Sequence, residues 1–412
     1  MTNTLYTNDN LFILNGLNSN LVDLIYLDPP FNTNKIYSAP IGSKAAGTSF
    51  KDMWTWKDVN EAYLDTLADK YPVLAKYIAN VGAIHSKPMM AYLTYMAQRI
   101  IQMHRVLKNT GSIYLHCDPT ASHYLKILLD EVFGKSNFRN EIVWCYTGGT
   151  DSKTTWQKKH DIILFYTKTK NYLLNPYYVP FKENTIKRFN KIDEDGKRYK
   201  INKLKSGRVT ITYMKEEGKL APDYWNIPIV NVTYQEATSY RTQKPLDLLK
   251  RIITASSNKG DIVMDPFCGC ATTCVAAHQL GRKWIGIDIE PSAHLLVDRL
   301  SDETGMFKDF INTKLIPERT DITFEAPSQS VKERLYKEQK GLCNACGKGF
   351  DIWNLEIDHI IPKSKGGGDY YENYQLLCSS CNKIKGVRPM EYLRMKIKVR
   401  EEMLKDKIIF GE

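Results

Sequence analysis

Between residues 261 and 273 the chain reads Asp261-Ile262-Val263-Met264-Asp265-Pro266-Phe267-Cys268-Gly269-Cys270-Ala271-Thr272-Thr273. The apolar residues before Asp265 predict a buried strand, and the segment 271–280 predicts a helix. Gly269 lets the backbone of the turn approach a ligand closely, and the helix start offers free N–H groups. The stretch therefore predicts a ligand-binding turn, although a plain strand-to-helix connection would show the same pattern.

The next expected strand, 284–288, ends at Asp288, whose carboxylate could accept both hydroxyls of a ribose, as in dinucleotide folds. Further strands are expected at 21–27, 112–116, 141–146 and 161–167, and helices at 91–107, 121–133 and 245–256. Strands that alternate with helices predict a doubly wound α/β sheet.

Composition sets the broad class. With 412 residues, 43% hydrophobic and 25% charged, the chain is expected to be a globular protein of two to three domains. The sequence has no apolar run of about 18 residues, and its N-terminus is polar, so we expect no membrane association and a location in the cell interior.

A net charge of +11 favours a polyanionic partner, because Lys and Arg side chains that neutralise phosphates release condensed counterions. Basic residues gather in the segment 181–220, which interrupts the α/β pattern. We interpret this segment as a candidate DNA-reading insert, and a solvated basic surface is the alternative.

Several motifs stand in a recognisable order. Asp28-Pro29-Pro30-Phe31-Asn32 follows the first expected strand, the basic insert comes next, and the turn at 265–273 comes last. In this order the chain resembles the amino-methylating DNA methyltransferases of the permuted, or beta, arrangement over about residues 1–300. The lead-in 240–245 and the segments 103–108 and 111–116 match the same family.

The resemblance implies a Rossmann-like methyltransferase sheet that uses S-adenosylmethionine. The implied catalytic turn is Asp28, Pro29, Pro30 and Phe31, and the implied cofactor-binding residues are Lys244, Pro245, Asp265, Pro266, Phe267, Gly269, Thr272 and Asp288. An exocyclic amine is a poor nucleophile, so methylation needs the base out of the stack, with Asp28 and the Pro29 carbonyl accepting the amine hydrogens and Phe31 facing the base. Asp-Pro-Pro-Phe favours adenine N6 by resemblance, and cytosine N4 is the alternative.

The chain departs from the family at two positions. The family usually has glycine where Ala271 stands and serine where Cys270 stands. A methyl group at Ala271 could crowd the cofactor or alter the turn.

Four cysteines form two Cys-x-x-Cys pairs, Cys343 with Cys346 and Cys378 with Cys381. Four thiolates at this spacing are the ligand set of a structural zinc site, and a domain of about 55 residues gains from a metal staple. Four unbridged core cysteines are the alternative. The scattered cysteines and the seven histidines other than His359 are expected to be core or surface groups.

The run Asp358-His359-Ile360-Ile361-Pro362, with Gly366-Gly367, Asn373 and Asn382, lies between and beside these pairs. Here the chain resembles the HNH nucleases of the ββα-metal group. That resemblance implies His359 as general base, Asp358 and Asn382 as ligands of one Mg²⁺ or Mn²⁺ ion, and Asn373 as the residue that orients the imidazole. Lys363, Lys365, Lys383, Lys385 and Arg388 are expected to add charge for phosphate.

Together these observations predict a DNA methyltransferase domain at 1–310 with a target-recognition region at 147–240, a linker at 311–332, an HNH domain at 333–392 and a helical tail at 393–412. We expect a single-chain restriction and modification enzyme that acts on double-stranded DNA in a bacterial-type, nucleoid-associated cytoplasmic setting, and we also consider a homodimer. The alternatives are methylation of cytosine N4, cleavage of methylated DNA, and a zinc module that only binds DNA.

Overall fold

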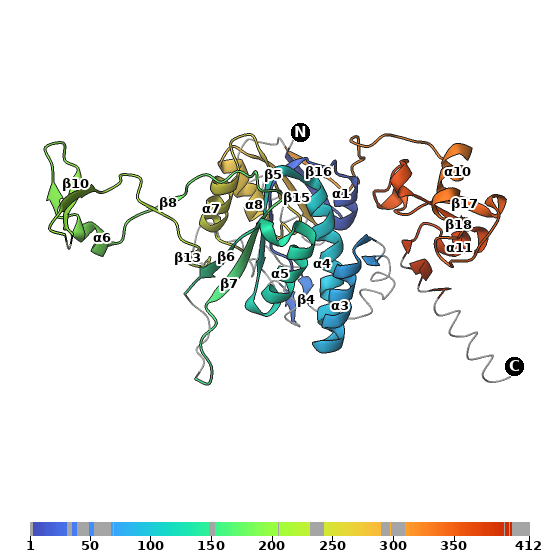
Figure 1. Cartoon of the computed structure of the whole chain (residues 1–412), viewed down its shortest axis with the longest axis horizontal. Coiled ribbons are helices and arrows are strands. Elements are labelled where there is room, and N and C mark those ends of the chain that lie inside the picture. The colour runs from blue at the N-terminus through green and yellow to red at the C-terminus, as the bar shows by residue number, and fades with distance from the viewer. Residues whose placement is uncertain are drawn as a thin grey trace.

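A computed structural model describes residues 3–30, 35–38, 49–52, 67–68, 70–147, 153–204, 206–230, 243–289, 297, 310–390, 392–394 and 396–397. For residues 35–38 and 49–52 it describes the backbone alone. The basic insert, the α/β part and the C-terminal part lie in this order along the long axis of the molecule, with the α/β part in the middle (Figure 1). No helix in the described part of the chain combines the length and the apolar character that a membrane span requires.

A nine-stranded sheet forms the centre of the α/β part, in the order β13-β6-β7-β5-β2-β14-β15-β1-β16. Its strands are β1 (Asn3–Thr7), β2 (Val22–Leu27), β5 (Leu107–Cys117), β6 (Phe138–Cys145), β7 (His160–Thr167), β13 (Tyr224–Asn226), β14 (Ile262–Asp265), β15 (Lys283–Asp288) and β16 (Phe310–Thr313). Only the pairings that involve β7 are antiparallel. The doubly wound α/β prediction is confirmed, and each strand expected from the sequence is present.

Helices cover both faces of this sheet. The elements on one face are α1 (Asn10–Gly16), α4 (Lys87–Val106) and α5 (Pro119–Phe133), with α3 (Pro72–Ile84) packed against α4; on the other are α7 (Leu246–Ser256) and α8 (Thr272–Gln279). The buried apolar residues of these helices and of the sheet form two separate hydrophobic cores, one on each face. The expected helices at 91–107, 121–133, 245–256 and 271–280 correspond to α4, α5, α7 and α8.

The basic insert leaves the sheet after β7 and returns as β13. It comprises β8 (Tyr178–Val179), α6 (Glu183–Arg188), β9 (Lys191–Ile192), β10 (Arg198–Lys203), β11 (Val209–Tyr213) and β12 (Lys219–Leu220). These strands form two small sheets, β11-β10-β9 and β12-β8, and Figure 1 shows the β10 region extending away from the main sheet. The expected loss of the α/β pattern thus corresponds to small antiparallel sheets. A further hairpin of β3 (Lys35–Ser38) and β4 (Ser49–Asp52) precedes α3.

The C-terminal part is a small unit with its own core. It contains α10 (Gln329–Glu338), β17 (Leu355–His359), β18 (Tyr374–Cys378) and α11 (Ser379–Lys385). The two strands pair antiparallel, with Leu355 opposite Cys378 and His359 opposite Tyr374. This ββα order is the one expected of the nuclease resemblance.

The segment between the two parts, expected as a linker at 311–332, is fastened to both. Its first residues belong to β16, the edge strand of the main sheet. Asn18 and Thr320 exchange two hydrogen bonds of 2.8 Å, and Asp321 accepts from the Ser19 N–H at 2.9 Å. On the other side, the Glu325 N–H donates to the Asp369 carbonyl at 3.0 Å.

The small unit also touches the α/β part directly. Gly366 (φ 85°) approaches α1 so closely that a Cβ there would lie 2.7 Å from the carbonyl oxygen of Phe12. The Lys365 ammonium lies 5.4 Å from the centre of the Phe12 ring. The loop that contains Gly366 therefore packs against helix α1.

Candidate active sites

Parallel strands bring the first site together at one edge of the main sheet. Asp28 follows β2, Asp265 ends β14 and Asp288 ends β15, and these three strands are neighbours. Since the strands run parallel, their carboxyl ends meet at the same edge, where ligands bind in open α/β sheets. The structure thus places the predicted catalytic turn beside the predicted cofactor turn.

The Asp28 carboxylate has two different oxygens. Its Oδ2 lies 2.5 Å from the Lys244 ammonium, and both side chains are mostly buried. Its Oδ1 is buried and accepts no hydrogen bond from any residue that the structure describes. A buried acceptor without a partner is costly, so Oδ1 is suited to a donor that arrives with a ligand. Lys244, predicted near the cofactor, therefore contacts the catalytic turn.

Two prolines follow Asp28 in the predicted catalytic turn. Pro29 is buried and Pro30 half-buried directly after β2. Phe31, predicted to face the base, lies outside the described residues, and so does the lead-in up to residue 242. Pro245 caps the N-terminus of α7.

The Asp265 carboxylate shapes the second turn. It accepts hydrogen bonds from the Phe267 N–H at 3.0 Å and from the Thr273 hydroxyl at 2.5 Å. Burial raises the pKa of Asp265 to about 7, against the lowering effect of these two hydrogen bonds, and the charges of Asp28 and Asp288 also raise it. Asp265 is thus a structural carboxyl group that closes the turn Pro266–Gly269 on the start of α8.

Asp288 braces the same turn from the next strand. Its Oδ2 accepts from the Gly269 N–H at 2.6 Å, and its Oδ1 accepts from the Ile289 N–H at 2.8 Å. A carboxylate at this end of the strand is the group that accepts ribose hydroxyls in dinucleotide folds, which is the role predicted for Asp288. Thr272 is the first residue of α8. Its Oγ1 lies 3.4 Å from Cys270 Sγ, in a buried hydrogen bond.

Ala271 occupies a backbone position that favours glycine. Its backbone is left-handed, with φ 59° and ψ 23°, and its side chain is fully buried. For residues other than glycine this conformation costs roughly 1–2 kcal/mol, so the usual family glycine is the unstrained choice. The turn keeps the left-handed geometry with alanine, and Gly269 (φ 51°) supplies a second left-handed position.

Residues from α1 and α4, which sequence reasoning did not single out, support the turn from behind. Asn10 Nδ2 donates to the Pro266 carbonyl at 2.8 Å, and the Arg99 Nε donates to Asn10 Oδ1 at 2.6 Å. Arg99 also pairs with Asp9 at 3.0 Å and lies over the Tyr95 ring, 3.4 Å from its centre. The Asp9-Asn10 pair at the start of a short helix was the only local signal, because Arg99 lies far away in sequence.

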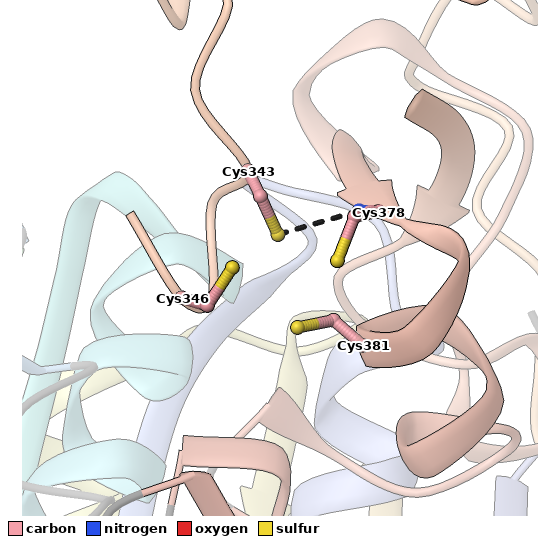
Figure 2. Close-up of side chains that lie close together, drawn as sticks. All are labelled: Cys343, Cys346, Cys378 and Cys381. Carbon is pink, nitrogen blue, oxygen red and sulfur yellow. Dashed lines mark hydrogen bonds between the residues drawn. The ribbon is translucent and has the colours of Figure 1, made fainter. Parts of the chain in front are cut away.

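The four predicted zinc ligands converge. The sulfur atoms of Cys343, Cys346, Cys378 and Cys381 all lie within 4.8 Å of one another, and Figure 2 shows them pointing toward a common centre. A tetrahedral zinc ion with Zn–S bonds of about 2.3 Å needs sulfur atoms about 3.8 Å apart. The Cys378 N–H also donates to Cys343 Sγ at 3.3 Å. The arrangement therefore fits a zinc ion that joins β18 and α11 to the 343–346 turn.

The imidazole of His359 is held by Asp369, a residue that we did not predict. His359 Nε2 lies 2.8 Å from Asp369 Oδ1, which also accepts from the Tyr374 hydroxyl at 3.1 Å, and Lys363 pairs with Oδ2 at 2.6 Å. Burial would raise the pKa of Asp369, but these hydrogen bonds from Lys363, His359 and Tyr374 lower it. An ionised carboxylate only accepts, so Nε2 carries the proton and Nδ1 is the basic nitrogen.

Asn373, predicted to orient the imidazole, is instead seen to hold the backbone of the adjacent loop. Its Oδ1 accepts from the Ile361 N–H at 2.8 Å, and its Nδ2 donates to the carbonyls of Ile361 and Gly368, both at 3.0 Å. Gly368 directly precedes Asp369. Asn373 thereby fixes the loop that delivers the carboxylate to His359.

The predicted divalent-metal ligands each have protein partners. Asp358 pairs with the Lys385 ammonium at 2.9 Å and accepts from Gln375 Nε2 at 2.8 Å. Asn382 Nδ2 donates to Glu356 at 2.6 Å. Carboxylate and amide oxygens suit Mg²⁺ or Mn²⁺ in kind, but a divalent ion at Asp358 has to compete with a buried lysine.

Lys385 was expected to add charge for phosphate, but it is buried inside the small unit. It is 1% exposed, and it also donates to the His359 carbonyl at 2.7 Å. Its charge is directed into the small unit. Lys363, by contrast, is exposed.

Comparison with known proteins agrees with this arrangement. The family model described as DNA methylase matches residues 22–299, and the model described as HNH endonuclease matches residues 343–388. A type II methyltransferase, M.EcaI of Enterobacter cloacae, is 29% identical over 369 residues, which covers 76% of this chain and 73% of that protein. The DNA adenine methyltransferase YhdJ of Escherichia coli (strain K12) is 28% identical and covers 69% of this chain and 78% of that protein.

Among solved structures, the M1.HpyAVI–SAM complex has a TM-score of 0.40 at 19% identity, over 72% of this chain and 98% of that chain. This likeness is too weak to add to the sequence matches. The DNA methylase model spans more than half of the 412 residues. The chain therefore belongs to the DNA methylase family, and it carries an HNH endonuclease domain at its C-terminal end.

Proposed function

We propose that this chain methylates adenine N6 at a specific DNA sequence, with S-adenosylmethionine as methyl donor, and that its HNH domain hydrolyses DNA, so that one polypeptide performs both modification and restriction. The observation that carries the methyltransfer assignment is the buried Oδ1 of Asp28, an acceptor that no described residue satisfies. An amine hydrogen of the target base would satisfy it.

The residues at the sheet edge support distinct roles in this reaction. S-adenosylmethionine supplies an electrophilic methyl group when bound, and the turn Asp265–Gly269 with Thr272 and Asp288 would hold it. Asp28 Oδ1 and the Pro29 carbonyl would accept the two amine hydrogens, which keeps the nitrogen lone pair directed at the methyl group. The nitrogen would form the new N–C bond with that lone pair as the methyl–sulfur bond of the donor breaks and its electron pair stays on sulfur, and Asp28 is positioned to accept the proton that the nitrogen loses.

Adenine is our choice of base for two reasons. The turn is Asp-Pro-Pro-Phe, and one relative is named as a DNA adenine methyltransferase. Cytosine N4 is the alternative, because both amines present two hydrogens to the same acceptors. The segment 147–240 is the region that we propose reads the DNA sequence, on the basis of its basic composition and its small exposed sheets.

In the nuclease domain, His359 Nδ1 would take a proton from the attacking water, since Nε2 is committed to Asp369. Asp358 and Asn382 would hold one Mg²⁺ or Mn²⁺ ion, which supplies positive charge to the phosphate and the leaving oxygen. We place the chain in the cytoplasm with the nucleoid because its substrate is DNA, and a homodimer stays a prediction that sedimentation velocity would test.

The test combines purified full chain with unmethylated plasmid, with and without S-adenosylmethionine and with Mg²⁺ or Mn²⁺. Nucleoside mass spectrometry identifies the methylated base, and gel electrophoresis reports strand breaks. We expect N6-methyladenine and metal-dependent breaks that prior methylation suppresses. Asp28→Ala should remove methylation alone, and His359→Ala should remove cleavage alone.

Other outcomes would change the assignment. Detection of N4-methylcytosine in place of N6-methyladenine would make cytosine the target base. Methylation without breaks in any metal would leave the zinc module as a DNA-binding element. Breaks that require prior methylation would make the chain a nuclease of methylated DNA.

A further inference from the structure

A line of buried and half-buried polar side chains runs from β2 across β5 and β7 to the end of β6 at the predicted catalytic edge of the main sheet. The Tyr26 hydroxyl on β2 lies 2.8 Å from His116 Nδ1 on β5, and His116 Nε2 lies 3.1 Å from Asp161 Oδ2 on β7. Tyr146, just after β6, donates to Asp161 Oδ1 at 3.3 Å. His116 is fully buried, and the Trp144 ring packs against it edge to face.

The hydrogen bonds in this line have one consistent direction. Burial and the charges of Asp28, Asp265 and Asp161 raise the pKa of Tyr26, so its hydroxyl stays protonated. Burial would also raise the pKa of Asp161, but His116 and the charge of Lys244 lower it, so Asp161 stays ionised. An ionised Asp161 only accepts. Tyr26 therefore donates to His116, and His116 donates to Asp161.

The line ends at Asp161, whose charge acts on the partner of Asp28. The charge of Lys244 lowers the pKa of Asp161, and the Lys244 ammonium lies 2.5 Å from Asp28 Oδ2. Lys244 is thus paired with the carboxylate of the predicted catalytic turn and attracted by the negative charge of Asp161, which His116 fixes. The remaining oxygen of Asp28, Oδ1, faces no described donor.

We propose that Tyr26, His116 and Asp161 are positioning residues for amine methylation, which hold Lys244 so that it restrains Asp28 Oδ2 and leaves Oδ1 free for the amine of the base. This inference rests on the proposed catalytic role of Asp28. Its physical basis is preorganisation, because a carboxylate already fixed before the base arrives need not reorient during methyl transfer. None of the three residues has to touch the base or the cofactor.

The first test is the single-turnover rate of methyl transfer by full-length Asp161→Asn at saturating DNA and S-adenosylmethionine. The substitution keeps the shape of the side chain and removes its charge. We expect the rate to fall on the order of 10- to 100-fold, as expected when a reacting group loses its orientation, with the dissociation constants of both ligands changed less than about twofold.

Tyr114→Phe is the matched control. Tyr114 precedes His116 by two positions on β5. Its hydroxyl forms a buried hydrogen bond of 2.7 Å with Ser256, which is not part of the line from Tyr26 to Asp161. We expect this variant to methylate at the wild-type rate. If it loses as much rate as Asp161→Asn, any buried hydrogen bond on this strand has the same effect, and the proposal is overturned.

A double-mutant cycle separates positioning from a general structural role. If Asp161 acts through Lys244, Asp161→Asn should lower the rate in the wild-type background but not further in a Lys244→Met background. Equal falls in both backgrounds would overturn the proposal.

Asp28→Ala keeps the inference distinct from the proposed function. If Asp28→Ala methylates normally, the proposed function itself fails. If Asp28→Ala is inactive while Asp161→Asn keeps the wild-type rate, only the positioning network fails. Should Asp161→Asn not fold, Tyr26→Phe, which keeps the ring and loses the hydroxyl, receives the same rate and binding measurements with the same two outcomes.

Discussion

Asp369 determines which nitrogen of His359 can act as the proposed base, because its carboxylate accepts a hydrogen bond from the Nε2–H. It is held in turn by Lys363 and Tyr374, so the imidazole has a defined tautomer and orientation. Aspartate beside a histidine base is a recurrent way of achieving both.

We predict that Asp369→Asn lowers the rate of metal-dependent DNA nicking by about 10- to 100-fold, less than the roughly 100- to 10,000-fold that a general base contributes, because His359 itself remains. Methylation should be unchanged, because the residue lies in the other domain. The measurement is a plasmid nicking time course with the methylation rate determined in parallel. Glu372→Gln, an exposed charge on the same loop, is the control. Wild-type nicking by Asp369→Asn would mean that another group orients His359.

Asp265 gives a prediction about pH. Its folded pKa of about 7 lies above the ordinary value, so the folded state binds the proton more tightly than the unfolded chain. Its contribution to stability is therefore full below about pH 4 and is lost as the pH rises toward 7. The difference in unfolding free energy between wild type and Asp265→Asn should shift against the wild type by on the order of a few kcal/mol over this range.

Urea unfolding of both proteins between pH 4 and 8 measures this difference directly. If the difference in unfolding free energy between the two proteins stays constant from pH 4 to 8, Asp265 has an ordinary carboxyl pKa in the folded state. In that case its hydrogen bonds to Thr273 and Phe267 would outweigh its burial.

At the scale of elements, helix α1 connects the two proposed active sites. Its first residue, Asn10, donates to the Pro266 carbonyl in the cofactor turn, and its later residues Phe12 and Asn15 contact the loop at 365–366 of the nuclease domain. A helix of seven residues has little stability of its own. Arg99 and Arg105 hold it, the latter through the Leu14 and Leu17 carbonyls.

We predict that Asn10→Ala weakens S-adenosylmethionine binding by about 5- to 10-fold, the equivalent of one hydrogen bond of about 1 kcal/mol. The reason is that the Pro266 carbonyl loses its donor and the turn loosens. Isothermal titration calorimetry would measure the affinity. Asn15→Ala, at the other end of the same helix, is the control and should bind the cofactor normally. Equal weakening by both would point to loss of the helix and not of the contact.

At the scale of the whole molecule, the two domains have separate cores but a fixed connection. The segment 314–321 is bonded to the loop after α1, and the Arg319 guanidinium pairs with Asp321 while lying 5.6 Å from the centre of the Tyr370 ring in the nuclease domain. The connection therefore restricts how far the two sites can move apart.

The separate cores predict that zinc loss affects one activity. Cys378→Ser, or treatment with a strong chelator, should unfold the small domain and abolish nicking, because structural zinc supplies much of the folding free energy of such units. Methylation should persist. The measurements are zinc content by mass spectrometry and both activities on one plasmid. Loss of methylation as well would show that the domains fold as one unit through the 314–321 segment.

Much of this organisation was predictable from local pattern. The strand-turn-helix at 261–273, the Asp-Pro-Pro turn after a buried strand, the helices at 91–107 and 245–256, and the two cysteine pairs each lie within a short span, where periodicity and ligand spacing are informative. For the same reason the positions of Asp28, Asp265 and Asp288 at one edge of a parallel sheet could be expected once the fold class was known.

The tertiary structure alone decided which side chains complete these sites. Lys244 reaches Asp28 across 216 positions, and Asn10 reaches Pro266 across 256. Asp369 replaces Asn373 at the imidazole, Lys385 turns inward to Asp358, and His116 becomes part of the line that leads to Lys244. These contacts depend on the order of strands in the sheet and the direction of each side chain, and neither leaves a periodic signal in the neighbouring sequence.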